Sequence, residues 1–189
     1  MSDEEKVELP KYIRVFANEI YFYCDVSIDS VAEFNSELRK MDVDLRIKYL
    51  SIGLDTRPEI KVFIHSNGGD LHAGFSAHDH MRNCKSKVIT IADGITASAA
   101  AIMYLAGHER LMTKNAWILI HQLGTDMCWG NFDEMKEELN NCQKIMKQMC
   151  DLCLELTRLP ESKLEKLMHK DILLSSKKCL KYGITSSIL

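Results

Sequence analysis

The stretch DGITASAAAIMYLAGHERLMTKNAWILIHQ, Asp93–Gln122, decides the fold and holds the residues that we expect to carry chemistry. It opens with a small-residue turn that ends in Ser98 and continues into an alanine-rich apolar run typical of a buried helix. It closes with a strand-like apolar run over 116–120 that leads into His121. A serine hydroxyl becomes a competent nucleophile only with a base in hydrogen-bond reach, and the free N–H groups of a helix's first turn can hold the resulting oxyanion.

Both residues also have a simpler explanation. Ser98 could be a helix N-cap, because serine side chains commonly accept a hydrogen bond from a first-turn N–H group. His121 could be a histidine at a strand end with no part in chemistry. Two further segments favour the chemical interpretation: HSNGG at 65–69 and DILLS at 171–175.

The composition is that of an ordinary globular protein, and 189 residues predict a single domain. A net charge of −3 gives no electrostatic reason to expect a nucleic-acid or membrane partner. The seven cysteines follow no disulfide-framework spacing, and the first residues lack the apolar centre of a secretory signal. We therefore expect reduced thiols in a cytoplasmic or equivalent reducing compartment, with no metal and no cofactor.

Strand-like and helix-like segments alternate along the chain. The strand-like runs are 19–24, 60–65, 87–92, 109–113 and 116–120, and the helix-like ones are 25–49, 71–83, about 99–106, 131–158, 161–169 and about 176–183. This alternation predicts an α/β fold with a mainly parallel sheet. The loops at Gly68 and Ser98 both follow a strand, at the sheet edge where sites are usually built. Residues 1–18 are predicted to be a flexible segment that precedes a single domain over 19–189, whose first helix could be capped by Asp29 or Ser30.

The segment 131–158 contains no glycine or proline and predicts a helix of about 40 Å at 1.5 Å per residue. So long a helix either lies along the whole body or protrudes and meets a partner subunit. Its methionines, Met135, Met146 and Met149, could form an adaptable apolar seam or pack inside the subunit, and the sequence leaves both open.

Four motifs in order resemble the proteolytic subunit of the ATP-dependent Clp protease (ClpP). They are HSNGGDLHAG from 65, GITASAAA from 94, ILIHQ from 118 and KDILLSSKKCLKYGI from 170. The resemblance covers most of the chain from about residue 19 onwards. It implies a ClpP/crotonase-like α/β fold of repeated β-α units, with a long protruding handle helix in a handle region over about 124–158.

The resemblance also implies roles, residue by residue. Ser98 matches the nucleophile, His121 the general base and Asp171 the carboxylate that orients the imidazole. Gly69 matches the glycine of the oxyanion hole, with the amide of Ala99 as the second donor. The flanking residues match the substrate-binding backbone, where strand segments pair with an extended peptide: Gly68, Asp70, Leu71, Leu123 and Gly124.

The function implied by the resemblance is a serine endopeptidase that cuts unfolded polypeptides inside an oligomeric chamber. Family members form two stacked heptameric rings and are fed by an ATP-dependent AAA+ unfoldase. This sequence departs from the family pattern at Asn67 (a proline in the family) and Ala99 (a methionine), and no clear helix precedes Glu19, which leaves docking to an unfoldase open. Two alternatives remain. One is a structural or regulatory ring subunit. The other is a crotonase-type acyl-CoA enzyme, which holds an oxyanion with backbone amides but has no Ser–His–Asp set.

Overall fold

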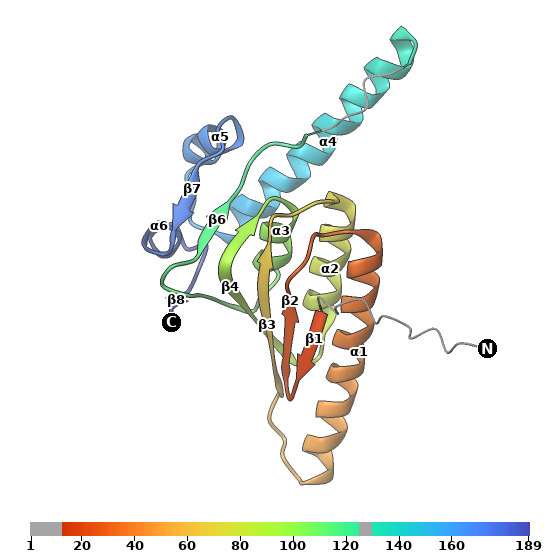
Figure 1. Cartoon of the computed structure of the whole chain (residues 1–189), viewed down its shortest axis with the longest axis vertical. Helices are drawn as coiled ribbons and strands as arrows, with labels where there is room; N and C mark the ends of the chain where they lie inside the picture. Colours follow the sequence, from red (N-terminus) through yellow and green to blue (C-terminus); the bar gives the residue numbers. More distant parts are fainter. Residues whose placement is uncertain (1–12, 125–129) are drawn as a thin grey trace, which may run out of the picture.

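The computed structural model describes residues 13–124 and 130–189, and Figure 1 shows their arrangement. In this part of the chain, eight strands form one sheet in the order β1-β2-β3-β4-β5-β8, with β6 paired to β4 and β7 paired to β6. All pairings are parallel except β1 with β2 and β6 with β7. The predicted α/β fold with a mainly parallel sheet is confirmed. The strands are β1 (Ile13–Phe16), β2 (Glu19–Phe22), β3 (Glu59–Ser66), β4 (Lys87–Ala97), β5 (Glu109–Met112), β6 (Trp117–Leu119), β7 (Leu173–Ser175) and β8 (Ser187–Ile188).

The predicted helices form close to their expected bounds. They are α1 (Ile28–Ser51), α2 (Leu71–Asn83), α3 (Ala99–Leu105), α4 (Phe132–Leu156), α5 (Glu161–Met168) and α6 (Ser176–Lys181). The first helix is capped by Ser27 rather than by Asp29 or Ser30. The Ser27 side chain accepts from the Ser30 amide while the Ser30 hydroxyl accepts from the Ser27 amide, which satisfies two first-turn donors.

Three short strands have no counterpart in the sequence pattern: β1, β7 and β8. The strand β1 pairs antiparallel with β2, from Ile13 opposite Phe22 to Phe16 opposite Glu19. The prediction of a flexible segment over 1–18 is therefore wrong for residues 13–18, which form this strand and the turn after it; residues 1–12 lie outside the described part. The turn is fixed by Ala17, at φ 52°, and by Asn18, whose side chain donates to the Glu59 carbonyl.

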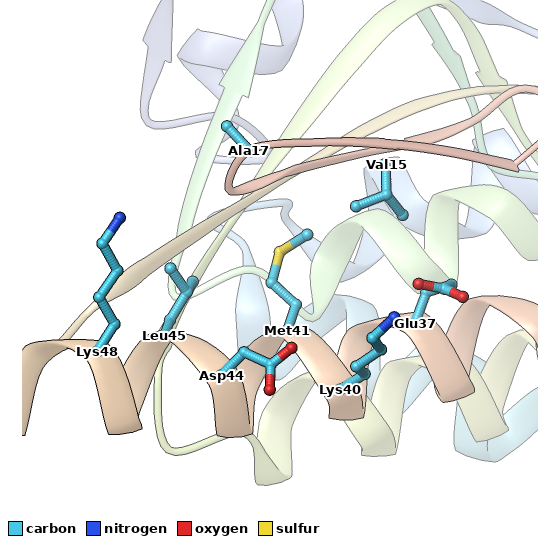
Figure 2. Close-up of a pocket in the computed structure, with 8 residues that line it drawn as sticks. All are labelled: Val15, Ala17, Glu37, Lys40, Met41, Asp44, Leu45 and Lys48. Carbon is cyan, nitrogen blue, oxygen red and sulfur yellow. The ribbon is translucent and has the colours of Figure 1, made fainter.

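A hollow of about 270 Å³ lies between β1 and α1. In Figure 2, Val15 and Ala17 lie above it and the side chains of α1 lie below. Val15, Met41 and Leu45 give it an apolar lining, and charged α1 side chains surround them: Glu37, Lys40, Asp44 and Lys48. None of these residues is a predicted site residue, so the hollow is separate from the expected chemistry.

The helix α4 protrudes from the body of the molecule, as Figure 1 shows. Its 25 residues span about 37 Å at 1.5 Å per residue. Only its C-terminal half reaches the core, where Met149 and Cys153 are buried. The N-terminal half is exposed, with Phe132 and Leu139 at 74% and 59% exposure. Met149 therefore packs inside the subunit, whereas the outer half of the predicted handle helix exposes Phe132 and Leu139 among charged and polar side chains.

Arg110 anchors the base of α4. This arginine lies on β5, and its guanidinium donates to the carbonyl of Leu156, the last residue of α4, at 2.7 Å. It also donates to the carbonyls of Gly183 and Ile184 at 3.0 and 2.8 Å. One side chain thus ties the end of the helix and the segment before β8 to the central sheet.

Candidate active site

The strand β4 carries Ser98 because it changes partner along its length. Its residues Ile89–Ala92 pair with β5, whereas Ile95–Ala97 pair with β6. Gly94, at φ 76°, lies between the two halves. The Ser98 amide continues the second pairing by donating to the Leu119 carbonyl at 2.9 Å. Ser98 therefore lies at the end of β4, next to β6.

The backbone of Ser98 is strained. Its φ of 56° and ψ of −128° fall outside the regions that L-residues favour, at a typical cost of about 1–3 kcal/mol. Ser98 stands at the N-cap position of α3, but its side chain makes no capping hydrogen bond. Capping therefore does not explain this serine. A strained turn from a strand into a helix, with a serine at its tip, is the arrangement that exposes a nucleophile.

The backbone of the Gly68–Gly69 loop lies directly against Ser98. A Cβ added to Gly68 would be 2.5 Å from Ser98 Cβ and 3.1 Å from the Ala99 amide nitrogen. Both glycines have positive φ, 101° and 141°, which other residues rarely adopt. Val26 anchors the loop, since its amide donates to the Gly68 carbonyl at 2.8 Å and its carbonyl accepts from the Asp70 amide at 2.7 Å. The glycines thus bring bare backbone next to Ser98 and the start of α3.

The antiparallel register of β6 and β7 brings His121 and Asp171 together. Leu119 pairs with Leu173, so continuing the register by two residues places His121 opposite Asp171. His121 Nδ1 lies 3.3 Å from Asp171 Oδ1. The histidine side chain is 29% exposed and the aspartate side chain 78% exposed. The pair lies just past the end of β6, beside the segment that enters β7.

Three segments that are distant in sequence therefore meet at one edge of the sheet. Ser98 ends β4, His121 follows β6 and Asp171 precedes β7, and these strands are neighbours. The Asp171 contact at Nδ1 leaves Nε2 as the imidazole nitrogen available to Ser98. Within the described residues, the Ser98 hydroxyl makes no hydrogen bond to His121; in many enzymes without substrate such bonds are long and tighten on binding.

The flanking residues only partly match their expected strand conformation. Asp70 caps α2, its carboxylate accepting from the Ala73 amide at 2.8 Å, and Leu71 is the first residue of that helix. Asp70 itself has an extended backbone, at φ −63° and ψ 118°, and α2 begins only at Leu71. Pairing of a peptide substrate with Asp70 and Leu71 stays a prediction. Leu123 and Gly124 lie outside any strand, and the Leu123 amide donates to the sulfur of Met146. Residues 125–129 of the predicted handle region lie outside the described part.

Comparison with known proteins decides the family. The model of the Clp protease family matches residues 35–189. The chain belongs to the Clp protease family. It is thereby a member of a family of serine endopeptidases, which confirms the resemblance seen in the motifs.

Relatives within the Clp protease family are of moderate identity. The chain is 34% identical to an ATP-dependent Clp protease proteolytic subunit 2 from Treponema denticola, over 82% of this chain and 78% of that protein. It is 31% identical to an ATP-dependent Clp protease proteolytic subunit from Deinococcus radiodurans, over 69% of this chain and 65% of that protein. A solved structure of a ClpP1 mutant from Listeria monocytogenes has the same fold, with a TM-score of 0.77 and 23% identity over 92% of this chain and 91% of that one.

Three residues that shape this Clp-family site have no signal in the sequence. Val26 acts only through its backbone, which no side-chain pattern could reveal. Ser66 and Thr96 are buried, and their hydroxyls bond to backbone groups: Ser66 accepts from the Gly68 amide at 3.1 Å, and Thr96 donates to the Ile64 carbonyl at 3.0 Å. Ser66 and Thr96 lie inside the HSNGGDLHAG and GITASAAA motifs, but nothing in the sequence shows which backbone groups their hydroxyls bond.

Two searches cover the residues 13–124 and 130–189. No group of three or more His, Cys, Asp or Glu side chains there could hold a metal ion. No helix of that part is both long enough and apolar enough to cross a bilayer. Five of the described cysteines are free thiols: Cys24, Cys84, Cys150, Cys153 and Cys179.

Proposed function

We propose that this chain is a serine endopeptidase subunit that cuts unfolded polypeptides, with Ser98 as nucleophile, His121 as general base and Asp171 as the orienting carboxylate. The observation that carries the proposal is the meeting of the strained Ser98 turn with the Gly68–Gly69 backbone, beside a His121–Asp171 pair 3.3 Å apart. Family membership supports the reaction class.

The proposed reaction has two halves. Ser98 Oγ attacks the carbonyl carbon of the scissile peptide while its proton passes to His121 Nε2. The amides of Gly69 and Ala99 donate hydrogen bonds to the oxyanion that forms. Because these donors are already oriented, no reorganisation of solvent is needed during the reaction. The intermediate collapses when His121 returns the proton to the leaving amine. Water, deprotonated by His121, then hydrolyses the acyl-enzyme and regenerates Ser98.

Asp171 serves the reaction without contacting the substrate. A carboxylate at Nδ1 holds the tautomer whose Nε2 is unprotonated and therefore basic, and it stabilises the imidazolium that forms during attack.

We propose that the substrate binds as an extended strand along Leu123 and Gly124. Among the residues that the structure describes, no heavy atom lies within 4 Å of a Cβ built on Gly124, which leaves space for a peptide backbone to approach it. On the opposite side, the backbone of Gly68 lies directly against Ser98, where any side chain would clash. Asp70, whose backbone is extended, and Leu71, the first residue of α2, would contact the substrate at the edge of this groove.

We further propose that the subunit works in an assembly of two stacked heptameric rings. The exposed apolar residues Phe132 and Leu139 on α4 would pack against a second copy of the chain, which would enclose the active sites in a chamber. Relatives carry the name ATP-dependent, and we extend to this chain an AAA+ unfoldase that feeds the chamber in a reducing, cytoplasm-like compartment.

A fluorophosphonate probe tests the catalytic assignment on the assembled protein. We expect it to label Ser98 and to stop cleavage of an unfolded polypeptide, and we expect Ser98→Ala to abolish both. Ser51→Ala is the matched control, because Ser51 is an exposed serine that only bonds the Lys48 carbonyl. An assembled wild-type protein with neither labelling nor cleavage would favour a structural ring subunit, and tight binding of acyl-CoA that survives Ser98→Ala would favour the crotonase-type alternative.

A further inference from the structure

The ladder between β3 and β4 is irregular just before the candidate site. Regular pairing runs from Glu59 opposite Lys87 to Ile64 opposite Ala92, and resumes with Ser66 opposite Thr96. Residues 93–95 of β4, here named the β4 bulge, therefore face the single residue His65. The His65 ring lies on the bulge, because a Cβ added to Gly94 would be 2.3 Å from His65 Nδ1. A bulge of this kind bends a strand and redirects the residues after it, which here lead to Ser98.

Two side-chain hydrogen bonds cross this irregularity. His65 Nδ1 lies 2.8 Å from the carbonyl oxygen of Asp93, and the second bond, from Thr96, lies closer to Ser98 along β4. Thr96 is fully buried, and its Oγ1 donates to the Ile64 carbonyl of β3 at 3.0 Å. Thr96 lies between two strands, opposite Ser66 of β3 on one side and Ile118 of β6 on the other. Its hydroxyl thus ties the strand that leads to Ser98 to the strand that leads to the glycine loop.

The other side of this junction is held by a second hydroxyl. Ser66, 3% exposed, accepts a hydrogen bond from the Gly68 amide at 3.1 Å. That bond fixes the direction of the chain as it enters the Gly68–Gly69 loop. Thr96 and Ser66, register partners across the ladder, therefore act on the two backbone segments that touch each other at Ser98.

We infer that Thr96 is a positioning residue for the peptidase reaction, an inference that rests on the proposed function. The proposed reaction needs a fixed distance and orientation between the amide of Gly69 and the hydroxyl of Ser98. These two residues follow different strands, β3 and β4. Misplacing a catalytic group by about 1 Å can cost on the order of 100-fold in rate. The hydrogen bond from Thr96 to Ile64 is the side-chain bond nearest to Ser98 on β4 that joins these two strands directly.

Thr90 offers a matched control on the same strand. It is also fully buried, and its Oγ1 donates to a backbone carbonyl, that of Tyr104, at 2.7 Å. Thr90 lies in the regular part of the ladder, opposite Val62, so its bond does not reach the glycine loop. Replacing either threonine with valine removes one buried hydroxyl at nearly constant shape.

The experiment compares Thr96→Val, Thr96→Ser and Thr90→Val in the assembled protein. It measures kcat and KM for a short peptide, and the affinity of a peptide boronate, which forms a tetrahedral adduct on Ser98. We expect Thr96→Val to lower kcat and boronate affinity by the same factor, on the order of tenfold, with KM changed by less than about twofold. Thr96→Ser keeps the hydroxyl and should restore both values to within about twofold of wild type. Thr90→Val should lower only the melting temperature.

A kcat of Thr96→Val equal to that of wild type would overturn the inference. An equal loss of kcat in Thr96→Val and Thr90→Val would also overturn it, because both substitutions would then act only by destabilising the protein. If Thr96→Val does not assemble, Ser66→Ala tests the same junction: a matching loss of kcat and boronate affinity supports the inference, and wild-type values overturn it. A wild-type protein that neither cleaves peptide nor binds the boronate would overturn the proposed function itself.

Discussion

His121 and Asp171 face each other just beyond the last pair of the β6–β7 ladder, with 3.3 Å between Nδ1 and Oδ1. The contact follows from the strand register, because Leu119 and Leu173 are partners and the two chains run in opposite directions. The imidazole is therefore oriented by a strand pairing rather than by a flexible loop. An arrangement built on paired strands is more exact than one built on loops alone.

Removing the charge of Asp171 tests this arrangement. Asp171→Asn keeps the shape but favours the tautomer with the proton on Nε2, so we expect kcat to fall by roughly 10²–10⁴ while KM changes little. Asp171 is 78% exposed, so thermal unfolding should not change. Asp151→Asn is the control, because Asp151 is an exposed aspartate whose partner is Lys147 on the α4 surface. Equal kcat in Asp171→Asn and wild type would contradict the assigned role.

The glycine loop gives a second prediction. A Cβ at Gly69 would lie 2.2 Å from the Val26 carbonyl oxygen, which is backbone and cannot rotate away. Gly69→Ala must therefore displace the loop, and we expect activity to fall by about 100-fold or more, together with a loss of stability of about 1–3 kcal/mol.

Substitution of Gly53 is the control that distinguishes the steric clash at Gly69 from the strain of a left-handed backbone. It too has positive φ, 71°, but nothing lies within 4 Å of a Cβ added there. Gly53→Ala should therefore cost only about 1–2 kcal/mol of left-handed strain and leave kcat unchanged. Peptide cleavage and thermal unfolding of both variants check the pair. Full activity in Gly69→Ala would show that the loop tolerates a shift and does not hold the oxyanion.

Stability should depend on the protonation of His78. Burial lowers the pKa of this imidazole, and the nearby Asp79 carboxylate opposes the shift without cancelling it. The imidazole of the unfolded chain therefore binds a proton more readily than that of the folded protein. The contribution of neutral His78 to the free energy of unfolding is complete above the ordinary pKa of about 6.5 and is lost as pH falls below it. Between about pH 7.5 and 5.5, the melting temperature of wild type should fall more than that of His78→Leu.

The control for His78 lies on the same helix. His80 is exposed, so His80→Gln should keep the wild-type dependence of melting temperature on pH. Parallel curves for wild type and His78→Leu over this range would mean that the buried imidazole does not resist protonation.

The fold could be predicted wherever apolar periodicity was long enough. Ser98 and His121 were proposed because each follows a strand-like apolar run, whereas Asp171 was assigned its role only through the resemblance. The catalytic roles of all three stay predictions. The short strands β7 and β8, of 3 and 2 residues, have too few residues for any period to show. Thr96 could not be found, because its role depends on a bulge and on a carbonyl 32 residues away in sequence. The capping of α2 by Asp70 was not predicted either, because a capping aspartate and a strand residue look alike in an isolated motif.

The exposed half of α4 gives the last prediction. Leu139 is 59% exposed on a helix that protrudes from the body, and an apolar side chain in that position gains stability only when another surface covers it. Leu139→Glu should therefore convert the assembled protein into smaller species in sedimentation velocity, and cleavage of an unfolded polypeptide should fall with it. The melting temperature of the dissociated subunit should stay that of a folded subunit, because Leu139 contributes nothing to the core.

Asn140→Glu is the control for Leu139→Glu. It introduces the same charge at an exposed polar neighbour and should leave the assembly intact. If both variants sediment like wild type, the α4 surface is not the contact between subunits, and the interface must be sought on the body of the molecule.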